Sequence, residues 1–226
     1  MSDEQRDAIA FLSRPAAYGL PDGSPIERID THISIVWLAA QRAYKLKRAV
    51  AFDYVDFSTV SSRHAACEAE VRLNRRTAPS LYLGVRAVTR DDAGLLALDG
   101  RGQPVDWLVE MVRFDQDALF DRLAERHQLD LGLMEGVADA IARLHAIADR
   151  RTDYGGHDDM AWVVEGNARA FAEQLDAGRE RDLADRSTTA IRAAVERHAS
   201  LLELRRRCLS QRLTQMMVHP KVGRVL

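Results

Sequence analysis

The sequence predicts an α+β fold, with a mostly β front half and an all-α back half. Three observations predict it. Apolar, β-branched runs separated by turn residues fill residues 26–50 and 81–112. One helical pattern, over residues 61–76, lies between these two groups of strands. After Phe114 the spacing of the apolar residues becomes helical and stays so.

The front half starts with a short helical pattern around Ile9 and Leu12, which ends at a breaker cluster over residues 19–25. Antiparallel strands are expected at 26–30, 33–39 and 42–50, with a tight turn at Gln41. Several N-cap candidates precede the helix expected over 61–76, which stops before Pro79. Strands at 81–89, 95–98 and 105–112 complete this half.

The back half contains four helical patterns, at residues 116–127, 130–149, 158–176 and 180–216. The second pattern carries the clearest apolar stripe and is expected to be a buried helix. Its stripe consists of Met134, Val137, Ile141, Leu144 and Ala148. Trp37 and Trp162 also fall at positions expected to face a core.

Length and composition limit the class of protein. A chain of 226 residues is expected to form one or two domains with a real core. A formal charge of −2 with 29% charged residues gives no basic footprint for nucleic acid or a membrane surface. No secretory signal and no membrane-spanning apolar run is seen. Cys67 and Cys208, far apart in sequence, are expected to be buried thiols in a reducing compartment. These features predict a soluble cytoplasmic protein.

Lysine is scarce in this chain, and its positions are informative. Only three of the 32 basic residues are lysines, at positions 45, 47 and 221. Lys45 and Lys47 are therefore expected to stand where arginine would not serve. A compact ammonium suits a point contact to phosphate, whereas a guanidinium is a planar fork. The alternative is an edge strand whose charged face lies in water.

Several segments resemble one family of kinases. They are residues 29–38, 43–48, 53–58, 67–79, 81–85, 106–111 and 113–117. Through them, over roughly residues 10–150, the chain resembles the aminoglycoside phosphotransferase-like kinases. More narrowly, it is similar to a bacterial subgroup that is sometimes fused to a P-loop ATPase domain. The resemblance implies a protein-kinase-like fold, with a small β-rich nucleotide-binding lobe at 1–112 and a partial helical large lobe at 113–226.

The resemblance also implies a nucleotide site. Lys45, with Lys47 as the alternate, would contact the α- and β-phosphates of ATP and pair with a glutamate of the next helix. That glutamate would be Glu70, or Glu68 one register earlier. Ser34 lies in the turn that bends over the phosphates in this family, although no glycine-rich loop is present. The small residue Ala43 would lie against adenine.

A second part of the expected nucleotide site is the hinge after the last strand. There the resemblance implies that backbone groups of Glu110 and Val112 hydrogen-bond adenine. Any side chain permits this role, so these two positions are assigned by place alone.

The catalytic part of the family pattern is not found. Its loop reads His-Gly-Asp-x-His-x-x-Asn, and a later aspartate binds the second magnesium ion. The run from Gly156 to Asp159 is superficially similar, but Val164 stands where asparagine is required. This run is expected to cap a helix that begins near Met160. No catalytic and no metal-binding residue is therefore assigned, and Mg²⁺ enters only by family analogy.

The family reaction is ATP-dependent phosphoryl transfer to a small-molecule hydroxyl, and its acceptor here is not identified. This chain looks like a member truncated before the catalytic loop, so it is expected to be inactive and to bind ATP weakly. One alternative is a non-catalytic pseudokinase module that binds nucleotide or a partner. Another is a structural or interaction protein whose helical half docks another chain. Self-association through the helical half is also expected, with residues 210–226 poorly ordered.

Overall fold

A computed structural model describes residues 3–52, 54–148 and 155–209. Helices and an antiparallel sheet make up the described part, which confirms the α+β class. The chain divides into two compact units, Met1–Glu135 and Gly136–Leu226, and each is described by itself. The last strand ends at Val112, where the small lobe was predicted to end, and the division into lobes stays a prediction.

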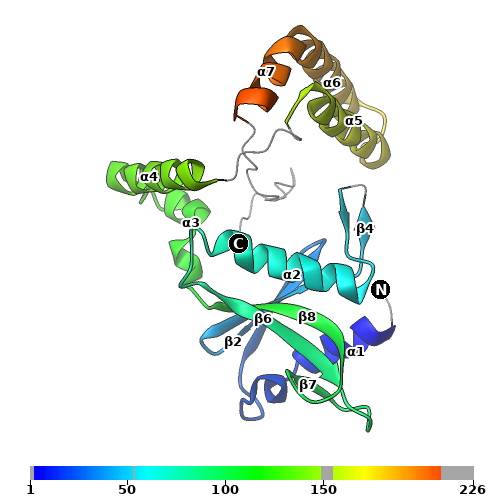
Figure 1. The fold of residues 1–226 in the computed structure, drawn as a ribbon, viewed down its shortest axis with the longest axis vertical. Helices are drawn as coiled ribbons and strands as arrows, with labels where there is room; N and C mark the ends of the chain where they lie inside the picture. The colour runs from blue at the N-terminus through cyan, green and yellow to red at the C-terminus, as the bar shows by residue number, and fades with distance from the viewer. Residues whose placement is uncertain (1–2, 53, 149–154, 210–226) are drawn as a thin grey trace. The chain divides into compact units, whose positions relative to one another are not determined.

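Six strands form the main sheet of the first unit, in the order β1-β2-β3-β8-β6-β7 (Figure 1). Every neighbouring pair is antiparallel. The strands are β1 Ile26–Asp30, β2 Ser34–Ala39, β3 Arg42–Lys47, β6 Tyr82–Arg90, β7 Leu96–Leu98 and β8 Gln103–Val112. All six were predicted to within three residues at each end. The two-residue strands β4 Ala51–Phe52 and β5 Val55–Asp56 form a separate hairpin that the sequence did not predict.

Helical segments account for most of the remaining described residues. In the first unit they are α1 Asp3–Leu12, η1 Pro15–Tyr18, α2 Val60–Asn74, η2 Gln116–Ala118 and α3 Phe120–Glu125. Helix α4, Leu131–Ile147, runs from the first unit into the second, which holds α5 His157–Gln174, α6 Arg179–Arg197 and α7 Ala199–Leu209. None of the helices in the described part of the chain is long and apolar enough to cross a membrane.

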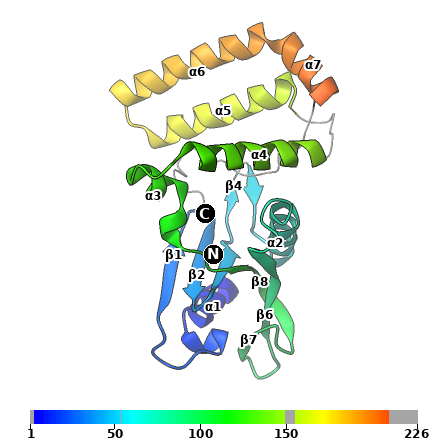
Figure 2. The ribbon, with the colours of Figure 1, turned by 90° about the vertical axis from the view of Figure 1, so that its left-hand side faces the viewer.

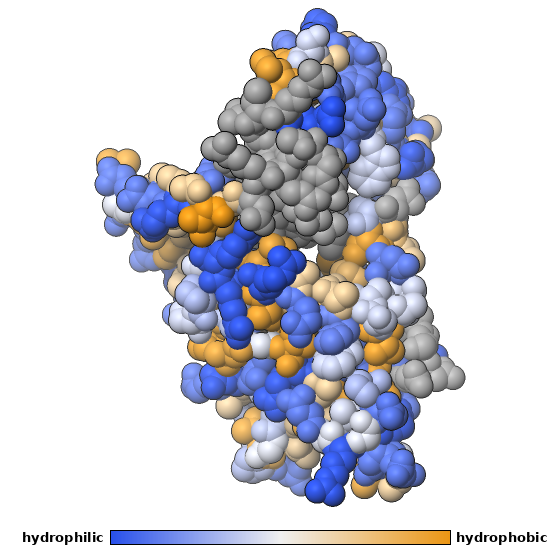
Figure 3. Space-filling view, viewed as in Figure 1, coloured by the Kyte–Doolittle hydropathy of each residue, from blue (hydrophilic) through white to orange (hydrophobic). Residues whose placement is uncertain are grey.

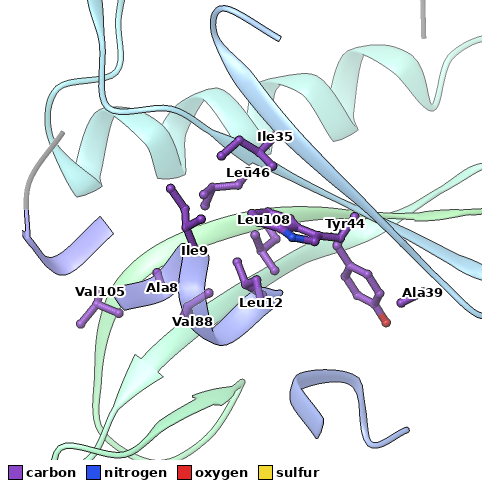
Figure 4. Close-up of a cluster of buried hydrophobic side chains, with 11 residues drawn as sticks. Ala8, Ile9, Leu12, Ile35, Ala39, Tyr44, Leu46, Val88, Val105 and Leu108 are labelled. Atoms are coloured by element: carbon purple, nitrogen blue, oxygen red, sulfur yellow. The ribbon is translucent and has the colours of Figure 1, made fainter. Parts of the chain in front are cut away.

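Helix α1 covers one face of the sheet, which curls around it (Figure 2). Its residues Ala8, Ile9 and Leu12 recur at helical spacing and are buried against alternate residues of the strands. The rest of this core consists of Ile35, Trp37, Ala39, Tyr44, Leu46, Val88, Val105 and Leu108 (Figure 4). Trp37 is fully buried, as predicted.

Helix α2 lies on the opposite face of the sheet (Figure 1). It starts with a capping box in which Thr59 and Ser62 exchange hydrogen bonds between side chain and backbone. Its buried face places Cys67 and Val71 against Val109 of β8. Because the helix is capped at its start and packed in its middle, the side chains on this face have fixed positions relative to the sheet.

In the second unit, α5 and α6 pack together through Val164, Thr188 and Val195, the buried residues of these two helices. The predicted helix over residues 180–216 is divided here into α6 and α7, with His198 between them, and residues 210–216 lie outside the described part. The predicted core position of Trp162 is wrong, because its side chain is 52% exposed. Helix α5 also begins at His157, earlier than predicted, with Gly156 as its N-cap.

The apolar stripe predicted along α4 is not buried. Met134 and Ile141 are each about half exposed, and no residue of α4 is buried. Hydrophobic side chains stand at the surface along this helix (Figure 3). Helical spacing predicted the stripe correctly, but spacing alone does not say what covers it.

A histidine joins the start of α5 to α6. His157 Nδ1 lies 3.0 Å from Asp158 Oδ1, and its Nε2 lies 2.9 Å from Glu196 Oε1. Only an imidazolium donates from both ring nitrogens, so these contacts favour the charged form. Hydrogen bonds to Asp158 and then to Glu196 accordingly raise the pKa of His157.

Raising the pH should therefore loosen the second unit. A raised pKa stabilises the fold fully below the ordinary value near 6.5, and the contribution is lost as pH rises through the folded-state pKa. We expect the thermal midpoint, measured by circular dichroism from pH 5 to 9, to fall with pH more steeply in the wild type than in His157→Gln. Parallel curves for the two proteins would contradict this. The effect should be small because the carboxylates are exposed.

Candidate functional site

Strand β3 presents its two lysines on one face of the sheet. Lys45 and Lys47 are two residues apart, so both point to the face that carries Ala43, opposite to the α1 face. The register with β2 places Val36 across from Lys45 and Ser34 across from Lys47. The alternative of a charged strand edge in water is wrong, because β3 lies between β2 and β8 and Lys47 is only 6% exposed.

Helix α2 brings one glutamate to both lysines. Glu70 Oε1 lies 3.0 Å from Lys45 Nζ, and Glu70 Oε2 accepts a hydrogen bond from Lys47 Nζ. Glu68, the alternative, is 60% exposed and lies near His64 at 3.7 Å. Of the two glutamates, Glu70 is therefore the one that pairs with the lysines, and it pairs with both of them.

With both amines protonated and the carboxyl ionised, these three side chains carry one positive charge in excess. The side chains of Lys45, Lys47 and Glu70 are 22%, 7% and 11% exposed, so water screens the charges poorly. Burial raises the pKa of Glu70, but the attraction of the two lysines outweighs it and lowers the pKa to about 2. Burial and repulsion by Lys45 lower the pKa of Lys47 against the attraction of Glu70. The arrangement would be neutralised by an anion beside Lys45, the more exposed of the two lysines.

Ser34 adds a buried hydroxyl to the same face. It is 1% exposed, and its Oγ has no hydrogen-bond partner among the described residues. Its backbone is fixed, since Thr31 Oγ1 accepts from Ser34 N at 2.9 Å and donates to Ser34 O at 3.0 Å. An unpartnered buried hydroxyl costs free energy, so a group that accepts from it or donates to it would be stabilised there.

An apolar patch continues this face beyond the lysines. It consists of Val36, Leu38 and Ala43, with Ile29 and Met111 packed against them. Ala43 is two residues from Lys45 on the same strand, so buried apolar side chains, at most 5% exposed, lie directly beside the charged group. The apolar cluster and the charged group next to it match, in chemistry, a ligand that joins a flat apolar ring to a negative group.

The structure does not bring Glu110 and Val112 to the lysines. Glu110 pairs with Tyr44 and Gly84 inside the sheet, and its side chain points to the α1 face, 3.0 Å from Arg86 Nη1. The Val112 N–H donates to Leu81 O at 2.9 Å. An adenine contact at these positions stays a prediction, and at Val112 it needs a group other than this N–H.

Sequence reasoning missed a second polar cluster next to the site. Arg63 of α2 and Asp106 of β8 form an ion pair of 2.7 Å with side chains 2% and 0% exposed. Gln5 of α1 contacts the same carboxylate. The sequence marks each residue singly, since Asp106 interrupts an apolar strand and Arg63 lies two helical turns before Glu70, but no local pattern pairs them.

Comparison with known proteins finds relatives that match part of the chain. Over 135 residues, 59% of the chain, it is 33% identical to "Uncharacterized protein Rv2004c" of Mycobacterium tuberculosis H37Rv and to "Uncharacterized protein Mb2027c" of Mycobacterium bovis. The match spans about a quarter of the length of these curated relatives. No family model and no solved structure matches the chain.

Proposed function

We propose that the first unit is a kinase-like, nucleotide-binding lobe of the aminoglycoside phosphotransferase-like type, and that Lys45 contacts the phosphates of ATP. One observation carries the proposal: two lysines of one strand converge on Glu70 and leave an excess positive charge in a poorly hydrated site. The order of three strands, a helix and the later strands agrees with the small lobe that the resemblance implies.

The neighbouring residues fit the rest of a nucleotide. The side chains around Ala43 are apolar, as a purine requires, but they are at most 5% exposed, so a purine must displace the groups that cover them. The Ser34 hydroxyl offers a donor near Lys47. ATP thus suits the residues present. For Mg²⁺ the fit is different, since the described residues include no group of three or more His, Cys, Asp or Glu side chains that could hold a metal ion. No step through Mg²⁺ is proposed.

Binding, rather than turnover, is the function proposed for this chain, because the family's catalytic loop is not found in its sequence. A pseudokinase-like binding module fits the same residues. A purely structural role is less well supported, because a structural ion pair needs one cation for each carboxylate. A second buried lysine makes such a pair more costly unless an anion joins it.

Titration calorimetry with ATP tests the proposal. We expect Lys45→Ala to weaken ATP binding about ten- to hundredfold, the size of one charge-assisted hydrogen bond. Arg42→Ala is the matched control, because Arg42 lies on the same strand but on the other face and is 45% exposed. Its affinity for ATP should stay within about twofold of the wild type. Absence of ATP binding in the wild type, or equal affinity in Lys45→Ala, would overturn the proposal.

A further inference from the structure

Gln5 of α1 makes a hydrogen bond from the helix on one face of the sheet to the strand that carries the lysines. It is fully buried. Its Nε2 donates to Lys47 O at 3.0 Å and to Asp106 Oδ2 at 2.8 Å, and its Oε1 accepts from Ala49 N at 2.7 Å. One amide side chain thus fixes both the end of β3 and a buried carboxylate.

That carboxylate in turn holds α2. Asp106 Oδ1 accepts from Arg63 Nε at 2.7 Å and from Trp107 N at 2.9 Å. Arg63 also donates to the Phe57 carbonyl at 3.0 Å, just before the helix begins. The start of α2 is therefore attached to β8 through a carboxylate that Gln5 shares.

Two ionic attachments join one face of helix α2 to the sheet. Arg63 binds Asp106, and two turns later Glu70 binds Lys45 and Lys47. The spacing of seven residues places both attachments on the same side of the helix. Gln5 connects them, since it binds Asp106 and the carbonyl of Lys47. A displacement of α1 would thus change both attachments together.

We infer that Gln5 is a positioning residue, which from the opposite face of the sheet holds the end of β3 in register with α2 and so keeps Glu70 on both lysines. That the lysine site binds a nucleotide rests on the proposed function, whereas the hydrogen bonds of Gln5 do not depend on it. Through such a residue, the contact of Glu70 with both lysines depends on whether α1 is packed on the sheet.

Two kinds of variant separate this role from simple packing. Gln5→Met keeps most of the side-chain volume and removes its hydrogen bonds, and Gln5→Asn keeps an amide that is too short to reach all partners. Leu12→Ala is the matched control: it removes packing from the same helix, where Leu12 is fully buried, and leaves the amide in place.

The measurements are an NMR titration of the Glu70 carboxyl and hydrogen exchange of α2 amides, both without nucleotide. In Gln5→Met the titration midpoint of Glu70 should rise towards the ordinary range, and α2 should exchange about tenfold faster relative to global unfolding. Gln5→Asn should change both in the same direction. Leu12→Ala should lower global stability and leave the Glu70 midpoint unchanged.

Two results would overturn the inference. One is a Glu70 midpoint and α2 exchange in both Gln5 variants equal to those of the wild type. The other is an equal change in Leu12→Ala. Neither readout uses nucleotide, so a failure of ATP binding in the wild type would refute the proposed function and leave this inference standing.

Discussion

Asp106→Ala should lower the free energy of unfolding by about 3–5 kcal/mol, the cost of leaving one partner of a buried ion pair without the other. Arg63 is 2% exposed and would keep its charge without a carboxylate. The variant also removes a hydrogen-bond acceptor from Gln5. Urea unfolding at pH 7 measures this loss from the shift of the midpoint, provided that the free energy of unfolding of wild type and variant depends equally steeply on urea concentration.

Asp30→Ala is the control for this loss of stability. It removes the carboxylate that pairs with Arg28, where the side chains are 44% and 42% exposed. Removal of a surface pair should change the free energy of unfolding by less than about 1 kcal/mol. Similar losses in the two variants would mean that the buried pair does not hold α2 as described.

Glu70→Ala should have an effect of similar size, about 3–5 kcal/mol at neutral pH, since it leaves two close lysines without a counter-ion. Lys47 is less exposed to water than Lys45. Without Glu70 to attract its charge, the already lowered pKa of Lys47 should fall further in this variant. A lysine whose folded-state pKa is depressed gains folding free energy as pH rises from that value towards its ordinary 10.5. The loss in Glu70→Ala should therefore shrink between neutral and alkaline pH.

A double variant, Lys47→Met with Glu70→Ala, tests the cause of that loss. Removal of the buried ammonium should restore at least half of the stability at neutral pH and abolish the extra pH dependence. Glu68→Ala, at the exposed neighbouring glutamate, should change the free energy of unfolding by less than about 0.5 kcal/mol. A double variant less stable than Glu70→Ala would show that Lys47 stabilises the fold by packing.

The sequence predicted those features that depend on local pattern. Apolar, β-branched runs between turn residues placed the six main strands, and the scarcity of lysine pointed to Lys45 and Lys47. The register of Glu70 against Glu68 could not be decided from helical spacing, because both lie near the middle of α2. It depends on which side of the helix meets β3, which is a tertiary property.

Other features could not be predicted for related reasons. The buried Arg63–Asp106 pair joins residues 43 positions apart, and only the packing of α2 on β8 brings them together. Glu110 was assigned for its backbone groups alone, so its side chain carried no prediction, and strand alternation turns that side chain to the α1 face. The break between α6 and α7 at His198 is not marked by a glycine or a proline in the sequence.

The position of Cys67 has a practical consequence. Cys67 is fully buried on the face of α2 that packs on the sheet, between Arg63 and Glu70 in sequence, and burial raises the pKa of its thiol to about 12. A thiol reagent can reach it only when α2 separates from the sheet. In a Cys208→Ser background, the rate of labelling at Cys67 would therefore measure how often this helix detaches from the sheet. Because Glu70 lies on the same helix, the same rate would measure how often the lysine site opens.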